Sequence, residues 1–247
     1  MTGASHELVL RFLGTGTPLG LRGLHQSCIL VETSGHRVLL ECGMTALTSL
    51  GRIGIDPGDI DAVLVSHLHG DHFGGVPLLL LDAALRVRRR PLTIGGPGAT
   101  RQRVEDALGI FGWGSAGLDT VRFVPLVPGV TFAIAACEVT TFGVVHNPAT
   151  APTGLRLDTG GVTIGYSGDA GWSDALVEIA RGADLFICGV WSFDTEDATF
   201  VDLMTLIRHR DELDCRRIIL THLGPSMLDH LGDVPFEVAT EGLTIQL

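Results

Sequence analysis

Side chains that bind metal ions are concentrated in one short segment, residues 66–75, with the sequence SHLHGDHFGG. Three histidines and one aspartate fall within six positions: His67, His69, Asp71 and His72. His67 and His69 alternate, so on an extended backbone they project from the same face. Neutral imidazoles and a carboxylate suit zinc or another first-row divalent ion, and this ligand density is enough for two neighbouring sites.

The elements around this segment place it at the end of a buried strand. Residues 59–66 form a nearly continuous apolar run, typical of a strand covered on both faces. Residues 76–88 have a helical pattern that Pro91 ends. The alternative is a solvated histidine-rich loop, but such a loop has no reason to follow an apolar strand or to be flanked by glycines. We therefore interpret the segment as a metal site.

The rest of the chain alternates predicted strands and helices. Strands are expected over residues 8–13, 28–32, 36–41, 92–94, 121–124, 130–135, 138–142, 153–158, 162–166, 183–188 and 217–221. Further helices are expected over residues 45–51, 100–108, 173–181 with Ser173 as N-cap, and 199–210. With no repeat, low-complexity tract or linker, residues 1–247 are expected to form a single α/β domain with helices outside.

The first motif, His67-x-His69-x-Asp71-His72, resembles the H-x-H-x-D-H signature of the metallo-β-lactamase superfamily. Other stretches resemble its ribonuclease Z and phosphodiesterase branch: residues 12–18 (FLGTGTP) are similar to the first-strand signature, and residues 95–98 (GGPG) to a Gly-Pro loop. Residues 40–43 resemble its aspartate-cysteine-glycine turn, with Glu41 in place of the aspartate. The resemblance extends from residue 8 to about residue 230.

This resemblance implies an αββα sandwich of two mixed β-sheets flanked by helices, with two divalent metal ions at one edge between the sheets. Zinc is the expected ion, with Mn²⁺ and Fe²⁺ as alternatives. The implied ligands are His67, His69 and His146 for the first ion, Asp71, His72 and His222 for the second, and Asp169 between them. Each later ligand also has an ordinary alternative: a turn residue for His146, a helix cap for Asp169 and a core residue for His222. Their shared position at strand ends favours metal binding.

The expected function is dinuclear metal-dependent hydrolysis of a small phosphodiester, either a nucleotide or a short RNA. The expected nucleophile is a hydroxide that bridges the two ions, and Asp71 and Asp169 are the expected catalytic residues that orient it. A lactone or β-lactam hydrolase of the same fold is the first alternative. A non-hydrolytic metal-binding or di-iron redox module is the second. Redox relatives usually carry a glutamate where His69 stands here.

Charge and spacing argue against a large nucleic-acid partner. The net charge is −11, and all 17 basic residues are arginine. The ribonuclease Z enzymes that the chain resembles carry a long tRNA-clamping arm between the ligands that correspond to His146 and Asp169, whereas these two residues are only 23 positions apart here. The one dense basic run, Arg86 with residues 88–90, is interpreted as a solvated helix end that complements the helix dipole. The expected partner is therefore a small anionic substrate.

Five cysteines without a C-x-x-C pair, and no apolar run long enough to span a membrane, indicate a cytoplasmic protein; the apolar composition would allow a homodimer. Surface or core roles are expected for the histidines outside the ligand set: His6, His25, His36, His209 and His230. Packing in the core or at the rim of the site is the expected role of Trp172 and Trp191, which follow strand ends on the expected active-site side. The alternative is that they stack on a base or line an apolar pocket.

Overall fold

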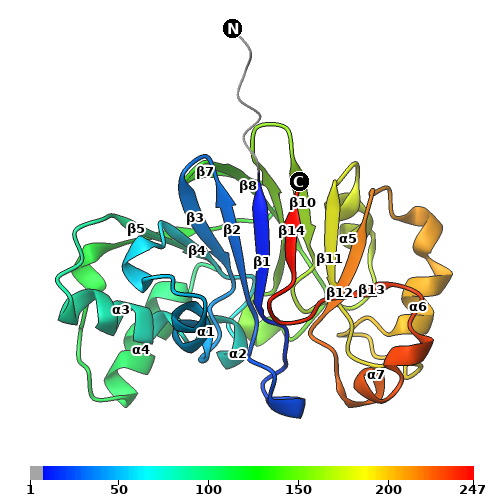
Figure 1. Cartoon of the computed structure of the whole chain (residues 1–247), viewed down its shortest axis with the longest axis horizontal. Coiled ribbons are helices and arrows are strands. Elements are labelled where there is room, and N and C mark those ends of the chain that lie inside the picture. Colours follow the sequence, from blue (N-terminus) through cyan, green and yellow to red (C-terminus); the bar gives the residue numbers. More distant parts are fainter. Residues whose placement is uncertain (1–7) are drawn as a thin grey trace, which may run out of the picture.

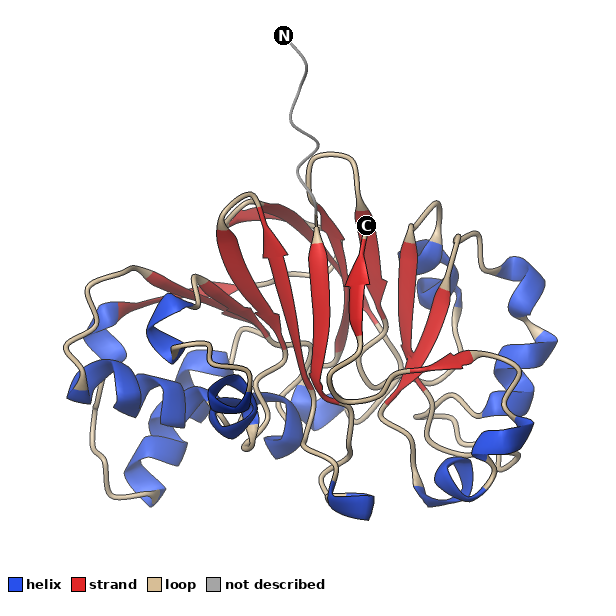
Figure 2. Ribbon diagram, viewed as in Figure 1, coloured by secondary structure: helices blue, strands red, loops and turns tan. Residues whose placement is uncertain are grey.

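Two seven-stranded β-sheets face each other, and helices cover the outer face of each sheet (Figures 1 and 2). A computed structural model of the chain describes residues 8–247. The first sheet has the strand order β14-β1-β2-β3-β4-β5-β6, and the second the order β13-β12-β11-β10-β9-β8-β7. This architecture confirms the expected αββα sandwich. That residues 1–247 form one domain stays a prediction.

The strands of the first sheet are β1 (Val9–Gly14), β2 (Cys28–Thr33), β3 (His36–Leu40), β4 (Ala62–Leu64), β5 (Leu92–Gly96), β6 (Val121–Pro125) and β14 (Thr244–Gln246). Those of the second sheet are β7 (Thr131–Ile134), β8 (Cys137–Gly143), β9 (Thr153–Asp158), β10 (Thr163–Tyr166), β11 (Leu185–Gly189), β12 (Ile218–Thr221) and β13 (Glu237–Val238). The α-helices are α1 (Ala46–Arg52), α2 (Gly70–Phe73), α3 (Val76–Leu85), α4 (Thr100–Ile110), α5 (Asp174–Ala180), α6 (Leu203–Arg208) and α7 (Pro225–Asp229).

Both sheets are mixed in the same way. Strands that follow one another through hairpins pair antiparallel, as β2 does with β3 and β8 with β9. Strands joined through helices pair parallel, as β4 does with β5 and β11 with β12. Parallel pairing needs a long crossover, and the helices supply it on the outer face of the sheet.

Apolar runs in the central strands reflect burial on both faces. In β4, Ala62 and Leu64 join the core between the sheets, whereas Val63 packs under the helices of the first sheet. In β11, Ile187 joins the same central core, and Phe186 packs under the helices of the second. Because successive side chains alternate between faces, a strand covered on both sides must be apolar at every position.

The predicted helices differ from the observed ones at their ends. The predicted helix over residues 199–210 begins only at Leu203, because the Asp202 side chain accepts a hydrogen bond from the Thr205 amide and caps the helix there. The helix predicted over residues 76–88 ends at Leu85, and Val87 has a φ of 52° that no helix accommodates. Ser173 occupies the N-cap position of α5, but its buried hydroxyl bonds to nothing within residues 8–247.

The arginine run after α3 is more than a solvated helix end. Arg88 donates to the carbonyl oxygen of Pro57 at 2.9 Å, and Arg90 pairs with Asp61 at 2.6 Å. Arg86 pairs with Asp82 of its own helix at 2.8 Å. The run therefore holds the loop after α3 against the segment that leads into β4, and it is a structural feature.

The structure adds short elements that periodicity does not predict: α7 and the strands β13 and β14 near the C-terminus. Within residues 8–247, no helix is both long and apolar enough to cross a membrane. All five cysteines are free, and four of them are buried.

Candidate metal centre

All predicted metal ligands lie in segments that follow strands at one edge of the sandwich. Two antiparallel pairings, β8 with β9 and β9 with β10, make β8 and β10 run in the same direction, and β12 runs parallel to them through β11. Their carboxyl ends therefore meet at one edge, where His146, Asp169 and His222 follow. The loop after β4 and the short helix α2 supply the remaining predicted ligands across the gap between the sheets.

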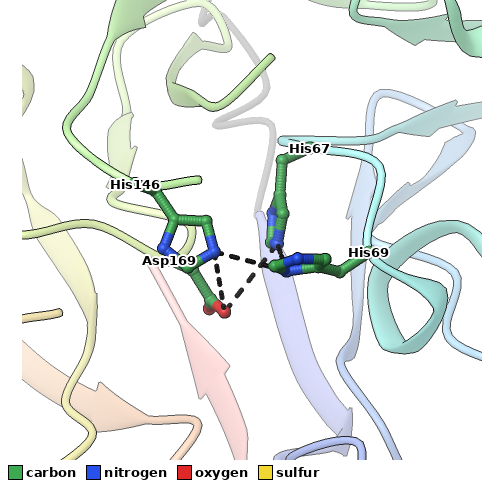
Figure 3. A group of neighbouring side chains, drawn as sticks. All are labelled: His67, His69, His146 and Asp169. Carbon is green, nitrogen blue, oxygen red and sulfur yellow. Dashed lines mark hydrogen bonds and ion pairs between the residues drawn. The ribbon is translucent and has the colours of Figure 1, made fainter. Parts of the chain in front are cut away.

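Four side chains form the first cluster: His67, His69, His146 and Asp169 (Figure 3). His69 Nδ1 lies 3.0 Å from His67 Nε2 and 3.3 Å from His146 Nε2. Asp169 Oδ2 lies 3.8 Å from His67 Nε2 and 4.0 Å from His146 Nε2. One atom of each residue thus faces a common point from three separate loops.

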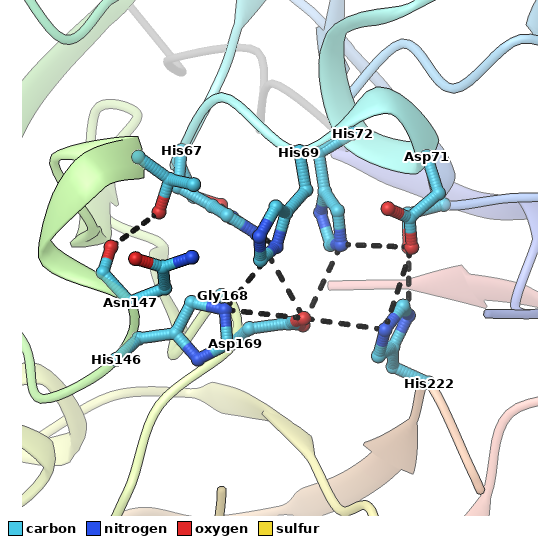
Figure 4. Close-up of polar contacts among 12 residues, drawn as sticks. His67, His69, Asp71, His72, His146, Asn147, Gly168, Asp169 and His222 are labelled. Carbon is cyan, nitrogen blue, oxygen red and sulfur yellow. Dashed lines mark hydrogen bonds and ion pairs between the residues drawn. The ribbon is translucent and has the colours of Figure 1, made fainter. Parts of the chain in front are cut away.

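A second cluster adjoins the first and contains Asp71, His72 and His222 (Figure 4). Asp71 Oδ2 lies 3.3 Å from His72 Nε2 and 3.6 Å from His222 Nε2. Asp169 reaches this cluster as well, because its Oδ2 lies 3.3 Å from His222 Nε2 and its Oδ1 lies 3.5 Å from His72 Nε2. The two clusters therefore share one carboxylate.

The unsatisfied polar atoms of the second cluster show that the site fits cations. Asp71 Oδ2 and His72 Nε2 are buried and have no hydrogen-bond partner within residues 8–247. Leaving buried polar atoms unpaired is costly, and a divalent ion between them removes that cost. Imidazole nitrogens with carboxylate oxygens are also the donor set that zinc and related ions prefer. The centre is thus suited to divalent metal ions.

Glu41 connects β3 to the histidine motif. It stands in place of the aspartate of the aspartate-cysteine-glycine turn that residues 40–43 resemble. Its carboxylate accepts hydrogen bonds from the Ser66 hydroxyl and, at 3.1 Å, from the Ser66 amide. Its Oε1 also lies 3.2 Å from His72 Nδ1, and both side chains are fully buried. Carboxylates in such positions orient a ligand histidine and raise its basicity.

Two other histidines of the clusters are oriented by groups far away in sequence. The Nδ1 atom of His146 lies 2.9 Å from the carbonyl oxygen of Thr199, to which it donates. Ser27 Oγ lies 3.1 Å from His222 Nδ1. In both histidines the opposite ring nitrogen, Nε2, therefore points into the cluster. Neither Thr199 nor Ser27 belongs to a motif, so the sequence carries no signal for these partners.

Backbone strain marks the same place. Glu41 has a φ of 64° and His222 a φ of 57°, in the left-handed region that non-glycine residues rarely adopt. The His222 amide donates to the Thr15 carbonyl at 3.0 Å, so the turn after β1 holds this strained residue. Gly14 is required there because a Cβ would lie 1.9 Å from the Gln26 carbonyl oxygen.

Burial and charge set the protonation of the metal-free centre. Burial lowers the pKa of His67 well below its ordinary value, and the nearby His72 lowers it further. Burial also lowers the pKa of His72, but the carboxylates of Asp169 and Glu41 outweigh it and raise that pKa well above its ordinary value. Burial raises the pKa of Asp169, but His222 and His72 outweigh it and hold that pKa well below its ordinary value. A proton on His72 must leave before this histidine can bind a metal.

The histidines outside the ligand set have structural contacts. His25 lies 2.8 Å from Ser49 Oγ, and His36 lies 3.6 Å from Asp61. His209 stacks on Trp172. His230 stacks on Phe193, whereas His6 falls outside the described residues.

Trp191 has a more direct relation to the centre than sequence reasoning expected. It lines the pocket above the two clusters together with Phe200, on which it stacks. Trp172 lies in a different pocket, next to His209. Phe200 falls inside the segment that was predicted to be helical, and no pattern in the sequence singled it out.

Relatives named ribonucleases align with most of the chain. Ribonuclease Z of Methanosarcina mazei is 25% identical over 278 residues, covering 90% of each chain. Ribonuclease BN of Escherichia coli O1:K1 is 28% identical over 231 residues, covering 72% of this chain and 75% of the relative.

Solved structures confirm the fold. The metallo-β-lactamase fold protein YhfI from Bacillus subtilis has a TM-score of 0.80 at 19% identity, covering 98% of this chain and 100% of that one. The short form of human tRNase Z has a TM-score of 0.77 at 22% identity, covering 96% and 98%. A diphosphatase of the PhnP family has a TM-score of 0.79 at 19% identity, covering 97% and 98%.

Fold, site and relatives together define the class: a hydrolase of the metallo-β-lactamase fold, in the ribonuclease Z and phosphodiesterase branch. Within this class, the chain belongs to the family described as anti-Pycsar protein Apyc1, whose model matches residues 8–237.

Proposed function

We propose that this enzyme is a dinuclear metal-dependent hydrolase that cleaves a small phosphodiester, a nucleotide or short RNA. The observation that carries the proposal is the shared carboxylate: Asp169 Oδ2 reaches both clusters, since it lies 3.3 Å from His222 Nε2 and 3.8 Å from His67 Nε2. A carboxylate between two sets of histidines is the arrangement that holds a pair of ions.

In this proposal His67, His69 and His146 hold the first ion, Asp71, His72 and His222 hold the second, and Asp169 contacts both. Zinc, or Mn²⁺ or Fe²⁺ in its place, would act as a Lewis acid and lower the pKa of an attacking water toward neutrality. Asp71 and Asp169 orient that water, since both carboxylates are buried and face the space between the clusters.

Two features support a small substrate. The segment between His146 and Asp169 folds into a short 3₁₀-helix (Pro148–Thr150) and the strands β9 and β10, so these residues provide no extended clamp. The pocket above the clusters has a volume of about 380 Å³, near the lower end for small-ligand sites. Names of relatives, ribonuclease Z and ribonuclease BN, support a phosphodiester of the nucleic-acid type.

A lactone hydrolase remains the competing function, because the same pocket also has apolar lining residues, Met44 and Pro18 among them. The di-iron redox alternative has less support, because position 69 contributes the imidazole nitrogen of a histidine to the first cluster and not the carboxylate of a glutamate.

The test is turnover by the zinc- or manganese-loaded protein of bis-p-nitrophenyl phosphate and of a lactone, together with metal analysis. We expect phosphodiester turnover and two ions per chain. Asp169→Asn should lower the metal content and abolish turnover, whereas the exposed Asp211→Asn should change neither. Lactone turnover without phosphodiester turnover would overturn the proposal, and an iron-containing coloured protein would revive the redox alternative.

A further inference from the structure

We propose that Trp191 and Phe200 form an aromatic wall that binds the base of a single nucleoside unit beside the metal centre. The inference rests on the proposed phosphodiester hydrolysis and names the part of the substrate that the enzyme recognises. Both side chains are half-buried, line the same pocket as Asp71 and Asp169, and keep part of their surface open to a ligand.

The lining of this pocket divides into a charged floor and an apolar side. The floor consists of the proposed metal ligands, and the apolar side consists of Pro18, Met44, Trp191 and Phe200. No arginine among residues 8–247 lines the pocket, and the chain contains no lysine. Charge at the phosphate can therefore be offset only at the centre, and the rest of the substrate meets apolar, largely aromatic surface.

The wall is held in place by contacts within the loop between β11 and α6 and by the loop after β12. The Trp191 amide donates to the Val201 carbonyl at 3.0 Å, which brings the segment carrying Phe200 alongside. Gly224 also packs closely on Trp191, since a Cβ there would lie 2.2 Å from the Trp191 carbonyl oxygen and 3.0 Å from its indole ring. A binding surface that is already ordered loses little conformational entropy when a ligand arrives.

Phe200 couples the wall to the metal centre. Its ring stacks on Trp191 with centroids 5.1 Å apart and an interplanar angle of 28°. The same ring meets His146 edge-on, with centroids 4.8 Å apart and an angle of 75°. A planar group stacked on this wall thus lies next to a proposed metal ligand. This is the position that a base would take if the phosphate of the same nucleotide lay at the metal centre.

A nucleobase is the planar group that best matches this surface. Aromatic side chains stack on any base, and they do so without needing cations. Gln26, at the rim of the pocket, accepts a hydrogen bond from the Met44 amide through Oε1 at 2.8 Å. Its Nε2 group is then the end left to donate to a base carbonyl. A long RNA would need arginine or lysine side chains along its backbone, and none among residues 8–247 lines the pocket.

The test compares two esters with the same leaving group, the p-nitrophenyl ester of thymidine 5′-monophosphate and ethyl p-nitrophenyl phosphate. The ratio of their kcat/KM values isolates recognition of the nucleoside. We expect Trp191→Leu and Phe200→Leu to lower this ratio at least about tenfold, the range that loss of one stacking partner produces. The conservative Trp191→Phe should retain most of the ratio. The control Trp172→Leu, which removes an aromatic ring from another pocket, should leave it unchanged.

An unchanged ratio in both leucine variants would overturn the inference. The proposed function would still stand in that case if the unaltered enzyme hydrolyses the two esters. A parallel loss of turnover with an aliphatic lactone would also overturn it, because the wall would then bind an acyl chain.

Fluorescence provides a readout that does not depend on turnover. Thymidine 5′-monophosphate added to the metal-loaded protein should quench tryptophan emission saturably in the unaltered enzyme and in Trp172→Phe. The quenching should vanish in Trp191→Phe. Absence of saturable quenching in the unaltered protein would overturn the inference even if the enzyme hydrolyses phosphodiesters.

Discussion

The Nδ1 atom of His72 lies 3.2 Å from Oε1 of Glu41, and both side chains are fully buried between the sheets. The contact links the end of β3 to the histidine motif after β4, and it leaves His72 Nε2 facing the second cluster. Glu41 is therefore a positioning residue for a proposed metal ligand.

Replacing the carboxylate in Glu41→Gln should weaken divalent metal binding about 10- to 100-fold, because an outer-shell carboxylate orients its histidine and raises its basicity. Competition with a chromophoric chelator measures this affinity. Glu41→Asp should retain more affinity than Glu41→Gln, since it keeps the charge. The exposed Glu138→Gln is the control and should bind metal normally; equal affinities in all three variants would exclude this role for Glu41.

Metal binding should release protons, and affinity should fall as the pH falls. Neighbouring carboxylates raise the pKa of His72, so near neutral pH the metal-free enzyme carries a proton there that metal must displace. His67, with its lowered pKa, is already neutral and contributes no such proton. Calorimetric titrations in buffers of different ionisation enthalpy count the protons released. A heat of binding that is the same in every buffer would contradict this prediction.

The loop before α6 should influence the first cluster through Thr199. Asp197 Oδ1 accepts hydrogen bonds from both the amide and the hydroxyl of Thr199 at 2.7 Å, and the Thr199 carbonyl in turn accepts from His146. Asp197→Ala should loosen this carbonyl and weaken binding of the first ion about fivefold, the usual effect of one lost hydrogen bond. Chelator competition tests it, with the exposed Asp194→Ala expected to match the unaltered enzyme.

The core between the sheets should dominate stability. Leu64 is fully buried there, so Leu64→Ala should lower the free energy of unfolding by about 2–5 kcal/mol. Leu85, at the end of α3, is 75% exposed, and Leu85→Ala should change the free energy of unfolding by less than about 0.5 kcal/mol. Urea denaturation of the metal-free protein measures both. Similar losses of unfolding free energy in the two variants would mean that burial between the sheets is not the main contribution to stability.

Most central strands and the αββα order could be predicted, because apolar alternation and resemblance to a known motif are both local properties of the chain. Helix ends were less predictable. The start of α6 depends on the Asp202 side chain, which caps one amide three residues on and stops the helix from beginning earlier. The strand β14 has only three residues and exists because it pairs with β1, at the opposite end of the chain.

For the site, the sequence by itself predicted four candidate metal ligands, since His67, His69, Asp71 and His72 are closely spaced in one short segment. Tertiary structure decided how these ligands are supported and what covers them. His146 is oriented by a carbonyl 53 positions away, and His222 by a serine 195 positions away. The wall of Trp191 and Phe200 likewise forms only when the two ends of the long loop between β11 and α6 fold against each other. Such contacts depend on where the strand ends meet in space, and the spacing of residues along the sequence does not predict this.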